Sequence, residues 1–281
     1  MTSLTEKTAI ITGPTSGIGR SFALHLAKKG YRLLLIARRE DKLSELCRYV
    51  EQHYNTKASY LRADLAEEAS IAMVEKELSQ LPSVDLLINN AGFGVAGHFG
   101  EIPLQEQMNM VNVHISSTLR FTYAVLPAMK KQRRGAIINV ASLSAFMVLP
   151  GNVMYATTKA AMIRFSQTLQ TELQYYNIRV QALSPGFTRT DFHASIPRRS
   201  EYMQDIPKWL WISPEEVVKA SLINLKGRRV ICIPGIINKT LYHINKNKVI
   251  ALLMRKMVGH RLKPLTKHNK AVVDHEAATT S

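Results

Sequence analysis

The sequence predicts a doubly wound α/β domain, a parallel sheet of the Rossmann type with helices on both faces. Short apolar runs alternate with helical patterns along the first two thirds of the chain. The runs are apolar throughout, and a glycine-rich turn follows the first of them. Strands that are buried on both faces have this continuous apolar character, and intervening helices provide the crossovers of a parallel sheet.

The expected strands are short runs such as TAIIT and RLLLIAR, too brief and too apolar for surface helices. They are expected at 8–12, 32–38, 58–65, 84–92, 135–142 and 178–186. The expected helices occupy the longer segments between the strands, and Gly30 is a typical stop for the first of them. They are expected at 17–30, 40–54, 67–81, about 104–130, and from just before Tyr155 to about 176. Ligands of such folds bind at the carboxyl ends of the strands.

Composition excludes several classes of protein. The 281 residues are 46% hydrophobic and 21% charged, as in a globular domain and unlike a disordered chain. Two cysteines, Cys47 and Cys232, provide no disulfide framework and indicate a reducing compartment. We see no signal peptide and no apolar run near the roughly 20 residues that span a bilayer. We therefore expect a cytoplasmic protein, with peripheral contact at a membrane surface left open.

Positive charge is concentrated at the C-terminal end. The chain carries a net charge of +16, and the segment from Lys226 onward holds 12 basic and 2 acidic residues, or 12 − 2 = +10. We expect a catalytic domain at 1–233 and a basic helical extension at 234–281 whose last residues are disordered. Such an extension either lies on an anionic membrane or packs on the domain or another subunit, and the sequence leaves both alternatives open.

Neither nucleic acid nor a metal ion is expected as a ligand. The basic extension contains no recognised nucleic-acid motif, and aromatic residues are not interleaved with its lysines. His243, His260 and His268 have no carboxylate or cysteine at metal-ligand spacing.

The glycine-rich turn reads TGPTSGIGR, with Gly13, Gly17 and Gly19 between the first strand and the first helix. Glycine permits the tight turn and lets the backbone approach a pyrophosphate, while the helix N-terminus provides N–H donors and the positive end of the dipole. The second strand then ends in IARRE. Arg38 and Arg39 stand where an NAD site has a carboxylate, and guanidinium groups suit a ribose 2′-phosphate. The sequence therefore predicts NADP(H).

Tyr155 and Lys159 stand four residues apart in YATTK, on one face of the predicted helix. Alone, this spacing most often means a packed tyrosine and a solvated lysine. The pair becomes informative because the chain also contains TGPTSGIG, NNAG at 89–92, Ser142, and PGFTRT at 185–190. Together these motifs resemble the short-chain dehydrogenases/reductases over about 7–233. Within that family the chain is most like the DltE-type bacterial reductases, and it is also similar to membrane-associated 3-oxoacyl-CoA and hydroxysteroid reductases.

The resemblance implies roles for individual residues. Tyr155 would be the general acid, Lys159 the group that lowers its pKa, Ser142 the carbonyl anchor, and Asn112 the fourth catalytic residue. The implied cofactor-binding residues are Gly13, Ser16, Gly17, Ile18, Gly19, Arg38, Asp64, Asn90, Tyr155, Lys159 and Thr188. One departure is Ser16, where many NADP-dependent members carry a basic residue, so recognition of the phosphate would depend on Arg38. Asn89 is expected to tie the sheet together.

The expected reaction is hydride transfer between NADP(H) and a ketone or alcohol. An irregular segment at 188–212 contains Trp209 and Trp211 and is expected to be an apolar substrate lid. A hydrophobic or acyl-chain carbonyl is the expected substrate, and the family implies a homo-oligomer, a dimer or tetramer. The alternative is a non-catalytic NADP(H)-binding sensor or scaffold with a membrane- or partner-binding tail. Such a protein has no need of the complete serine, tyrosine and lysine set.

Overall fold

The computed structural model describes residues 7–148, 150–190 and 207–246, and these contain a seven-stranded, fully parallel sheet. The strand order is β3-β2-β1-β4-β5-β6-β7, so the predicted doubly wound fold is confirmed. The strands are β1 (Thr8–Thr12), β2 (Arg32–Ala37), β3 (Ala58–Arg62), β4 (Leu86–Asn89), β5 (Gly135–Val140), β6 (Ile178–Leu183) and β7 (Ile231–Cys232).

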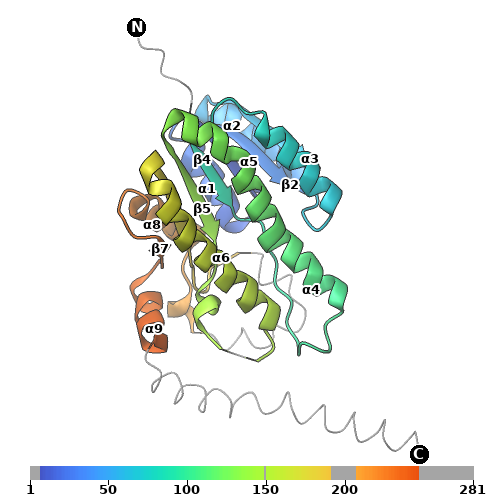
Figure 1. Ribbon diagram of the computed structural model, residues 1–281, viewed down its shortest axis with the longest axis vertical. Coiled ribbons are helices and arrows are strands. Elements are labelled where there is room, and N and C mark those ends of the chain that lie inside the picture. The colour runs from blue at the N-terminus through green and yellow to red at the C-terminus, as the bar shows by residue number, and fades with distance from the viewer. Residues whose placement is uncertain (1–6, 149, 191–206, 247–281) are drawn as a thin grey trace, which may run out of the picture. The chain divides into compact units, whose positions relative to one another are not determined.

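Helices cover both faces of the sheet (Figure 1). One core cluster joins the sheet to α1, α2 and α8, and another joins it to α3 and α5. The helix α6 packs on β6 through a third, smaller cluster. The α-helices are α1 (Gly17–Ala27), α2 (Glu40–Tyr54), α3 (Glu68–Ser79), α4 (Leu104–Val111), α5 (Ser117–Gln132), α6 (Val153–Leu173), α8 (Pro214–Asn224) and α9 (Ile236–Lys246).

Some elements differ from the sequence-based expectation. The strands β3 and β4 end at Arg62 and Asn89, three residues earlier than expected, because the following residues form loops at the edge of the sheet. The strand β7 has only two residues and left no periodic pattern. The helix α8 was not predicted, although the sequence indicates it, because Ser213 and Glu216 form a capping box before an apolar run.

The expected long helix at 104–130 is interrupted by a turn of π-helix, η1 (Asn112–Ser116), between α4 and α5. A π-turn holds one more residue than an α-turn and is often found at functional sites. The extra residue changes which side chains face the sheet in this segment. Sequence periodicity did not predict it.

Asn89 forms part of a buried hydrogen-bonded chain inside the sheet, as expected. Its Nδ2 donates to Asn139 Oδ1 at 2.8 Å, and Asn139 Nδ2 donates to Ser166 Oγ at 2.9 Å. The chain joins β4, β5 and α6, the three elements whose ends carry candidate site residues, Asn90 after β4, Ser142 after β5 and Tyr155 in α6.

The chain divides into two compact units, 1–239 and 240–281. The first turn of α9 belongs to the first unit, where the buried Asn238 side chain donates to Pro234 O at 2.8 Å. Residues 247–281 of the expected basic extension lie outside the described residues. In the described part of the chain, no helix is both long and apolar enough to cross a bilayer.

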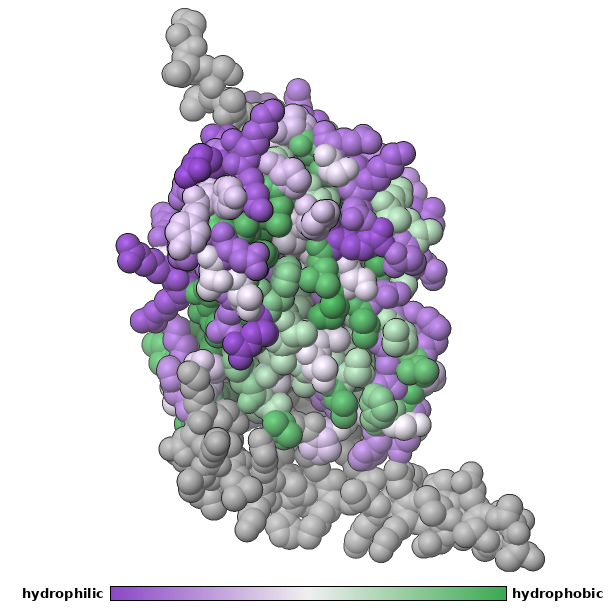
Figure 2. Space-filling model, viewed as in Figure 1, coloured by the Kyte–Doolittle hydropathy of each residue, from purple (hydrophilic) through white to green (hydrophobic). Residues whose placement is uncertain are grey.

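The helices α4 and α5 expose large apolar side chains. Leu104 and Met108 on α4 and Leu119 and Tyr123 on α5 are exposed, Tyr123 by 75%. Figure 2 shows hydrophobic residues gathered along the middle of the face that carries these helices. The exposed residues of α6 are mixed and include Ala160, Arg164 and Glu172.

Candidate active site

The site lies where the strand order reverses, because β1 has β2 on one side and β4 on the other. The loops that follow β1 and β4 are bonded to each other. Asn90 Nδ2 donates to Thr12 O at 2.9 Å and to Gly13 O at 3.0 Å. Thr12 Oγ1 in turn accepts the backbone N–H groups of Asn90 and Ala91. Asn90 therefore fixes the shape of the glycine loop from beneath.

The three glycine positions of the loop do not accommodate a side chain. A Cβ on Gly19 would stand 2.2 Å from Gly13 O, and Gly13 and Gly17 have positive φ angles of 64° and 53°. Ser16 is the N-cap of α1 but its side chain forms no capping bond, and the first turn that includes Ile18 holds no acidic residue. The N-terminus of α1 thus presents uncapped N–H donors and a positive dipole end to the crevice. These features fit a pyrophosphate.

The two arginines after β2 take different directions. Arg38 Nη1 lies 3.6 Å from Asp64 Oδ2 in an ion pair, with 73% of the Arg38 side chain exposed. Arg39 Nη2 donates to Thr15 Oγ1 of the glycine loop at 2.9 Å. Two guanidinium groups therefore border the β2 side of the crevice. The contact between Arg39 and the glycine loop was not predicted from the sequence.

Tyr155 and Lys159 lie on the inner side of α6 and are 8% and 3% exposed. Lys159 Nζ lies 5.7 Å from the centre of the Tyr155 ring and donates to Val140 O, at the end of β5, at 2.8 Å. This burial excludes the alternative that Lys159 is a solvated surface lysine. Lys159 forms no ion pair among the described residues, and burial alone lowers its pKa from 10.5 to about 7.

Ser142 follows β5 and is the N-cap of the short 3₁₀ helix η2 (Leu143–Phe146), which packs against α6. Its Oγ accepts hydrogen bonds from Ser144 N at 3.2 Å and from Ser144 Oγ at 2.9 Å. Because these contacts use the acceptor capacity of Ser142 Oγ, its own proton is available for donation. Ser144, which the sequence did not single out, therefore orients Ser142.

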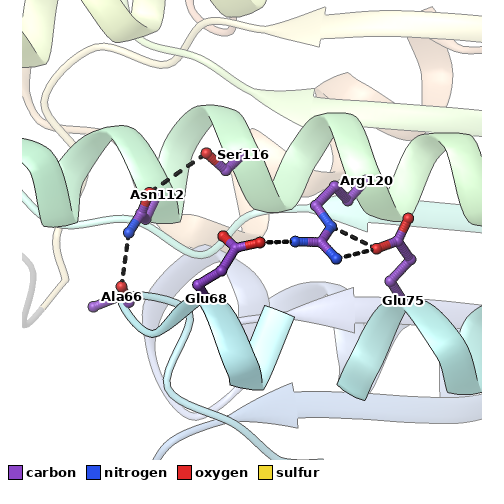
Figure 3. A network of polar contacts seen from close by, with 6 residues as sticks. All are labelled: Ala66, Glu68, Glu75, Asn112, Ser116 and Arg120. Atoms are coloured by element: carbon purple, nitrogen blue, oxygen red, sulfur yellow. Dashed lines mark hydrogen bonds and ion pairs between the residues drawn. The ribbon is translucent and has the colours of Figure 1, made fainter. Parts of the chain in front are cut away.

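The Asn112 side chain points toward the loop before α3 (Figure 3). Its Nδ2 donates to Ala66 O at 2.9 Å, and its Oδ1 accepts from Ser116 Oγ at 3.5 Å. Ala66 N donates to Asp64 Oδ1, so Asn112 supports the loop that carries Asp64. Further along α5, Arg120 pairs with Glu68 and Glu75 of α3. Asn112 thus anchors the π-turn to the neighbouring loop.

His114 is a residue that the sequence did not indicate. The π-turn places it in the interior at 0% exposure, with its ring centre 5.8 Å from that of Tyr155. A Cβ on Gly92 would stand 2.8 Å from His114 Nε2 and 3.4 Å from Lys159 Nζ, so both side chains surround this glycine. Burial, together with the nearby Lys159 charge, lowers the pKa of His114 well below 6.5.

The PGFTRT segment contributes Thr190 to the crevice. Thr188 is buried, and its hydroxyl donates to Gly186 O at 3.1 Å. Thr190 lies beside the glycine loop, because a Cβ added to Gly17 would stand only 2.8 Å from Thr190 Cγ2. Thr190 also lines a cavity of about 540 Å³. The other described residues of this cavity are Arg189, Lys208 and Trp211.

The ends of the expected lid are joined, while its middle, 191–206, lies outside the described residues. Thr188 bridges to Ile212, and Arg189 N donates to Ile212 O at 3.0 Å. Within the residues that are described, no group of three His, Cys, Asp or Glu side chains could hold a metal ion.

Comparison with known proteins agrees with this arrangement. The sequence model for "short chain dehydrogenase" matches residues 7–201. A 3-oxoacyl-[acyl-carrier-protein] reductase of Aquifex aeolicus is 33% identical over 222 residues, 78% of this chain and 90% of the relative. The very-long-chain 3-oxoacyl-CoA reductase-A of Danio rerio is 34% identical over 188 residues, 66% of this chain and 59% of the relative. The structure of a short-chain dehydrogenase from Sphingobium yanoikuyae in complex with NADPH has a TM-score of 0.75 and 28% identity, over 92% of this chain and 95% of that one.

Burial of Lys159 predicts an unusual dependence of stability on pH. Lys159 is deprotonated above about pH 7 in the folded, cofactor-free protein but only above 10.5 in the unfolded chain. Between these values the unfolded chain binds more protons, so the free energy of unfolding should rise with pH. The Lys159→Met variant should be more stable than the parent near pH 7, by roughly 2–4 kcal/mol, with the difference shrinking toward pH 10. Urea denaturation across this range measures it.

The matched control is Lys76→Met, which removes an exposed lysine from α3. Its pH dependence should be that of the parent. Equal pH dependence of the parent and Lys159→Met would show that burial does not shift the Lys159 pKa.

Proposed function

The chain belongs to the short-chain dehydrogenases, and from that membership we propose that it is an NADP(H)-dependent reductase of a hydrophobic or acyl-chain ketone, with Tyr155 as general acid. The observation that carries the proposal is the buried pair of Tyr155 and Lys159 beside a phosphate-binding glycine loop. A structural scaffold gains nothing from burying an ammonium group without a carboxylate partner.

The residues around the crevice fit a dinucleotide. The turn with its glycines at 13, 17 and 19 and the N-terminus of α1, which has no side-chain cap, suit the pyrophosphate, and Arg38 and Arg39 suit a 2′-phosphate. When it is bound, the reduced nicotinamide supplies the hydride. The protein has to polarise the carbonyl and deliver a proton.

Tyr155 delivers that proton. Its phenol donates to the carbonyl oxygen while hydride reaches the carbonyl carbon, so a ketone becomes an alcohol and a phenolate remains. An unperturbed tyrosine has a pKa of about 10, which makes it a poor acid near neutral pH. A protonated Lys159 beside the ring stabilises the phenolate and so lowers the pKa of Tyr155. Ser142, held by Ser144, donates its proton to the same carbonyl oxygen and stabilises the charge that develops there.

The substrate that we propose is a 3-oxoacyl thioester. The cavity beside Thr190 has an aromatic wall, where Trp211 lies 5.6 Å from Phe187 between ring centres. Two exposed cations border the same cavity, Arg189 and Lys208, and neither forms an ion pair within the described part of the chain. Two of the relatives are named for 3-oxoacyl groups on a carrier protein and on coenzyme A. Such carriers bring phosphate groups that these cations would attract.

Turnover of a carbonyl panel tests the activity. We expect the parent protein to oxidise NADPH with 3-oxoacyl-CoA substrates, and more slowly with the uncharged N-acetylcysteamine thioesters of the same chains. Steroid and simple aromatic ketones complete the panel. Tyr155→Phe should lose roughly 10²–10⁴ in kcat because it cannot donate a proton, while its affinity for NADPH stays within about twofold.

Activity in Tyr155→Phe close to that of the parent would contradict the role of Tyr155. If the parent bound NADPH but turned over no compound in the panel, the reductase proposal would fail for these substrates and the sensor alternative would gain support.

The two arginines predict a preference for NADPH over NADH. Arg38→Leu should raise KM for NADPH roughly 10–100-fold, because a charge-assisted contact to the 2′-phosphate is lost, and should leave KM for NADH unchanged. Arg39→Leu should raise KM for NADPH less, because one Arg39 nitrogen already donates to Thr15. Arg48→Leu, an exposed arginine on α2, is the control. An equal effect of Arg38→Leu on both cofactors would argue against this assignment.

We further propose that the exposed apolar side chains of α4 and α5 form a contact between two copies of the chain. Leu119 and Tyr123 stand one turn apart on α5, and both are exposed. We expect sedimentation velocity to show a dimer or tetramer, and Tyr123→Glu to shift it toward monomer because it buries a charge in the contact. Arg48→Leu again serves as control. A monomeric parent would rule the contact out.

A further inference from the structure

His114 has hydrogen-bond partners on both ring nitrogens, and these belong to two different parts of the site. Nε2 lies 3.2 Å from the backbone N of Phe93, in the loop after β4. Nδ1 lies 2.9 Å from Thr158 Oγ1 on α6. Thr158 Oγ1 in turn donates to Tyr155 O at 3.0 Å. A continuous chain therefore runs from the β4 loop through the π-turn to the backbone of the catalytic tyrosine.

The partners determine the tautomer of the ring. The Phe93 backbone N–H is a donor, so Nε2 must be the unprotonated acceptor. In a neutral imidazole the proton then resides on Nδ1 and is donated to Thr158 Oγ1. The Thr158 proton is already directed to Tyr155 O, so its oxygen is free to accept. Each donor in the chain meets an acceptor only in this one arrangement.

We propose that His114 is a positioning residue of the reductase site, a neutral Nδ1-protonated imidazole that holds the first turn of α6 against the β4 loop and so aims Tyr155 and Lys159 at the carbonyl. The kinetic test of this positioning role rests on the reductase function proposed above. His114 is not itself a proton donor to substrate, because it is fully buried and both nitrogens are engaged.

A neutral ring is required by the groups that face it. Among the described residues these are Tyr155 and Lys159 of α6, and no carboxylate is among them. A protonated ring would set a second positive charge beside the Lys159 ammonium. It would also present an N–H at Nε2 to the Phe93 N–H, two donors facing each other. Burial lowers the pKa of His114 and so keeps the ring neutral at the pH where Tyr155 works.

The π-turn explains how a helix residue reaches this position. An additional residue in a turn rotates the following side chains by about 100° relative to an uninterrupted α-helix. The same turn directs Asn112 outward to Ala66 and His114 inward to Thr158. The π-turn thus places His114 where the chain of hydrogen bonds can form.

The tautomer is tested directly by ¹⁵N NMR of the histidine rings in the full chain. The chain has nine histidines, and His114→Phe identifies the His114 signals by their disappearance. We expect one ring that stays neutral and protonated at Nδ1 from about pH 5 to about pH 8, with at most a small shift change as the neighbouring Lys159 titrates. A ring that is charged near pH 6, or protonated at Nε2, would overturn the proposal. This measurement needs no substrate, so it stands even if the proposed reaction is wrong.

The positioning role is tested by kinetics on whichever panel substrate turns over. His114→Phe and Thr158→Val each break the chain, and each should lower kcat roughly 10–100-fold, as a misplacement near 1 Å does, with KM for NADPH unchanged. The double variant should lose no more than either single variant, because both break the same chain. In alcohol oxidation, the pH of half-maximal kcat should rise toward 10, since Lys159 then stabilises the phenolate less well.

The matched control is Ser166→Ala, which removes another buried hydroxyl of α6. It should reduce stability without moving the pH profile. His114→Phe with parental kcat, or with the same small loss and unmoved pH profile as Ser166→Ala, would reduce His114 to a packing residue.

Discussion

The burial of the Lys159 ammonium is the constraint on which the site depends. It lies at the carboxyl end of β5 with a backbone carbonyl, Val140 O, as its hydrogen-bond acceptor. Taking a charge out of water without an opposite charge costs several kcal/mol, and the protein bears this cost at the end of an interior strand of the sheet. The result is a positive charge with little solvent around it, directed at the ring of Tyr155. An exposed lysine would be screened and would alter the tyrosine pKa much less.

The surrounding fold makes this arrangement possible. The parallel sheet brings the ends of β1, β4 and β5 to one edge, so that the glycine loop, Gly92 and Ser142 surround the same space. Gly92 is small enough for His114 and Lys159 to approach each other, and a neutral His114 adds no charge to the pair. In the proposed mechanism, stability and activity are opposed at position 159, as is usual where function needs a destabilising group.

Much of this could be predicted from the sequence, and the limits have physical causes. The apolar runs and glycine spacing predicted the parallel sheet and the crevice, because burial on two faces leaves a composition that can be read directly. The tyrosine and lysine were found through helical spacing and family motifs. The π-turn was missed because α4, the helix before it, has only 8 residues, too few to establish a phase against which the shift in α5 could be recognised. His114 was missed with it, since only the three-dimensional arrangement shows what its two nitrogens contact. The sequence predicted Thr188 at the crevice and missed Thr190, because two threonines in one loop differ only in the direction of their side chains.

The most direct test of this account is the pKa of Lys159 in the cofactor-free protein, followed through the ¹³Cε chemical shift of labelled lysine and assigned with Lys159→Met. The account predicts a midpoint near pH 7, because the ammonium is buried without a carboxylate. A midpoint above pH 10, the ordinary value for lysine, would mean that burial does not desolvate the ammonium group and would contradict the constraint on which this account is built.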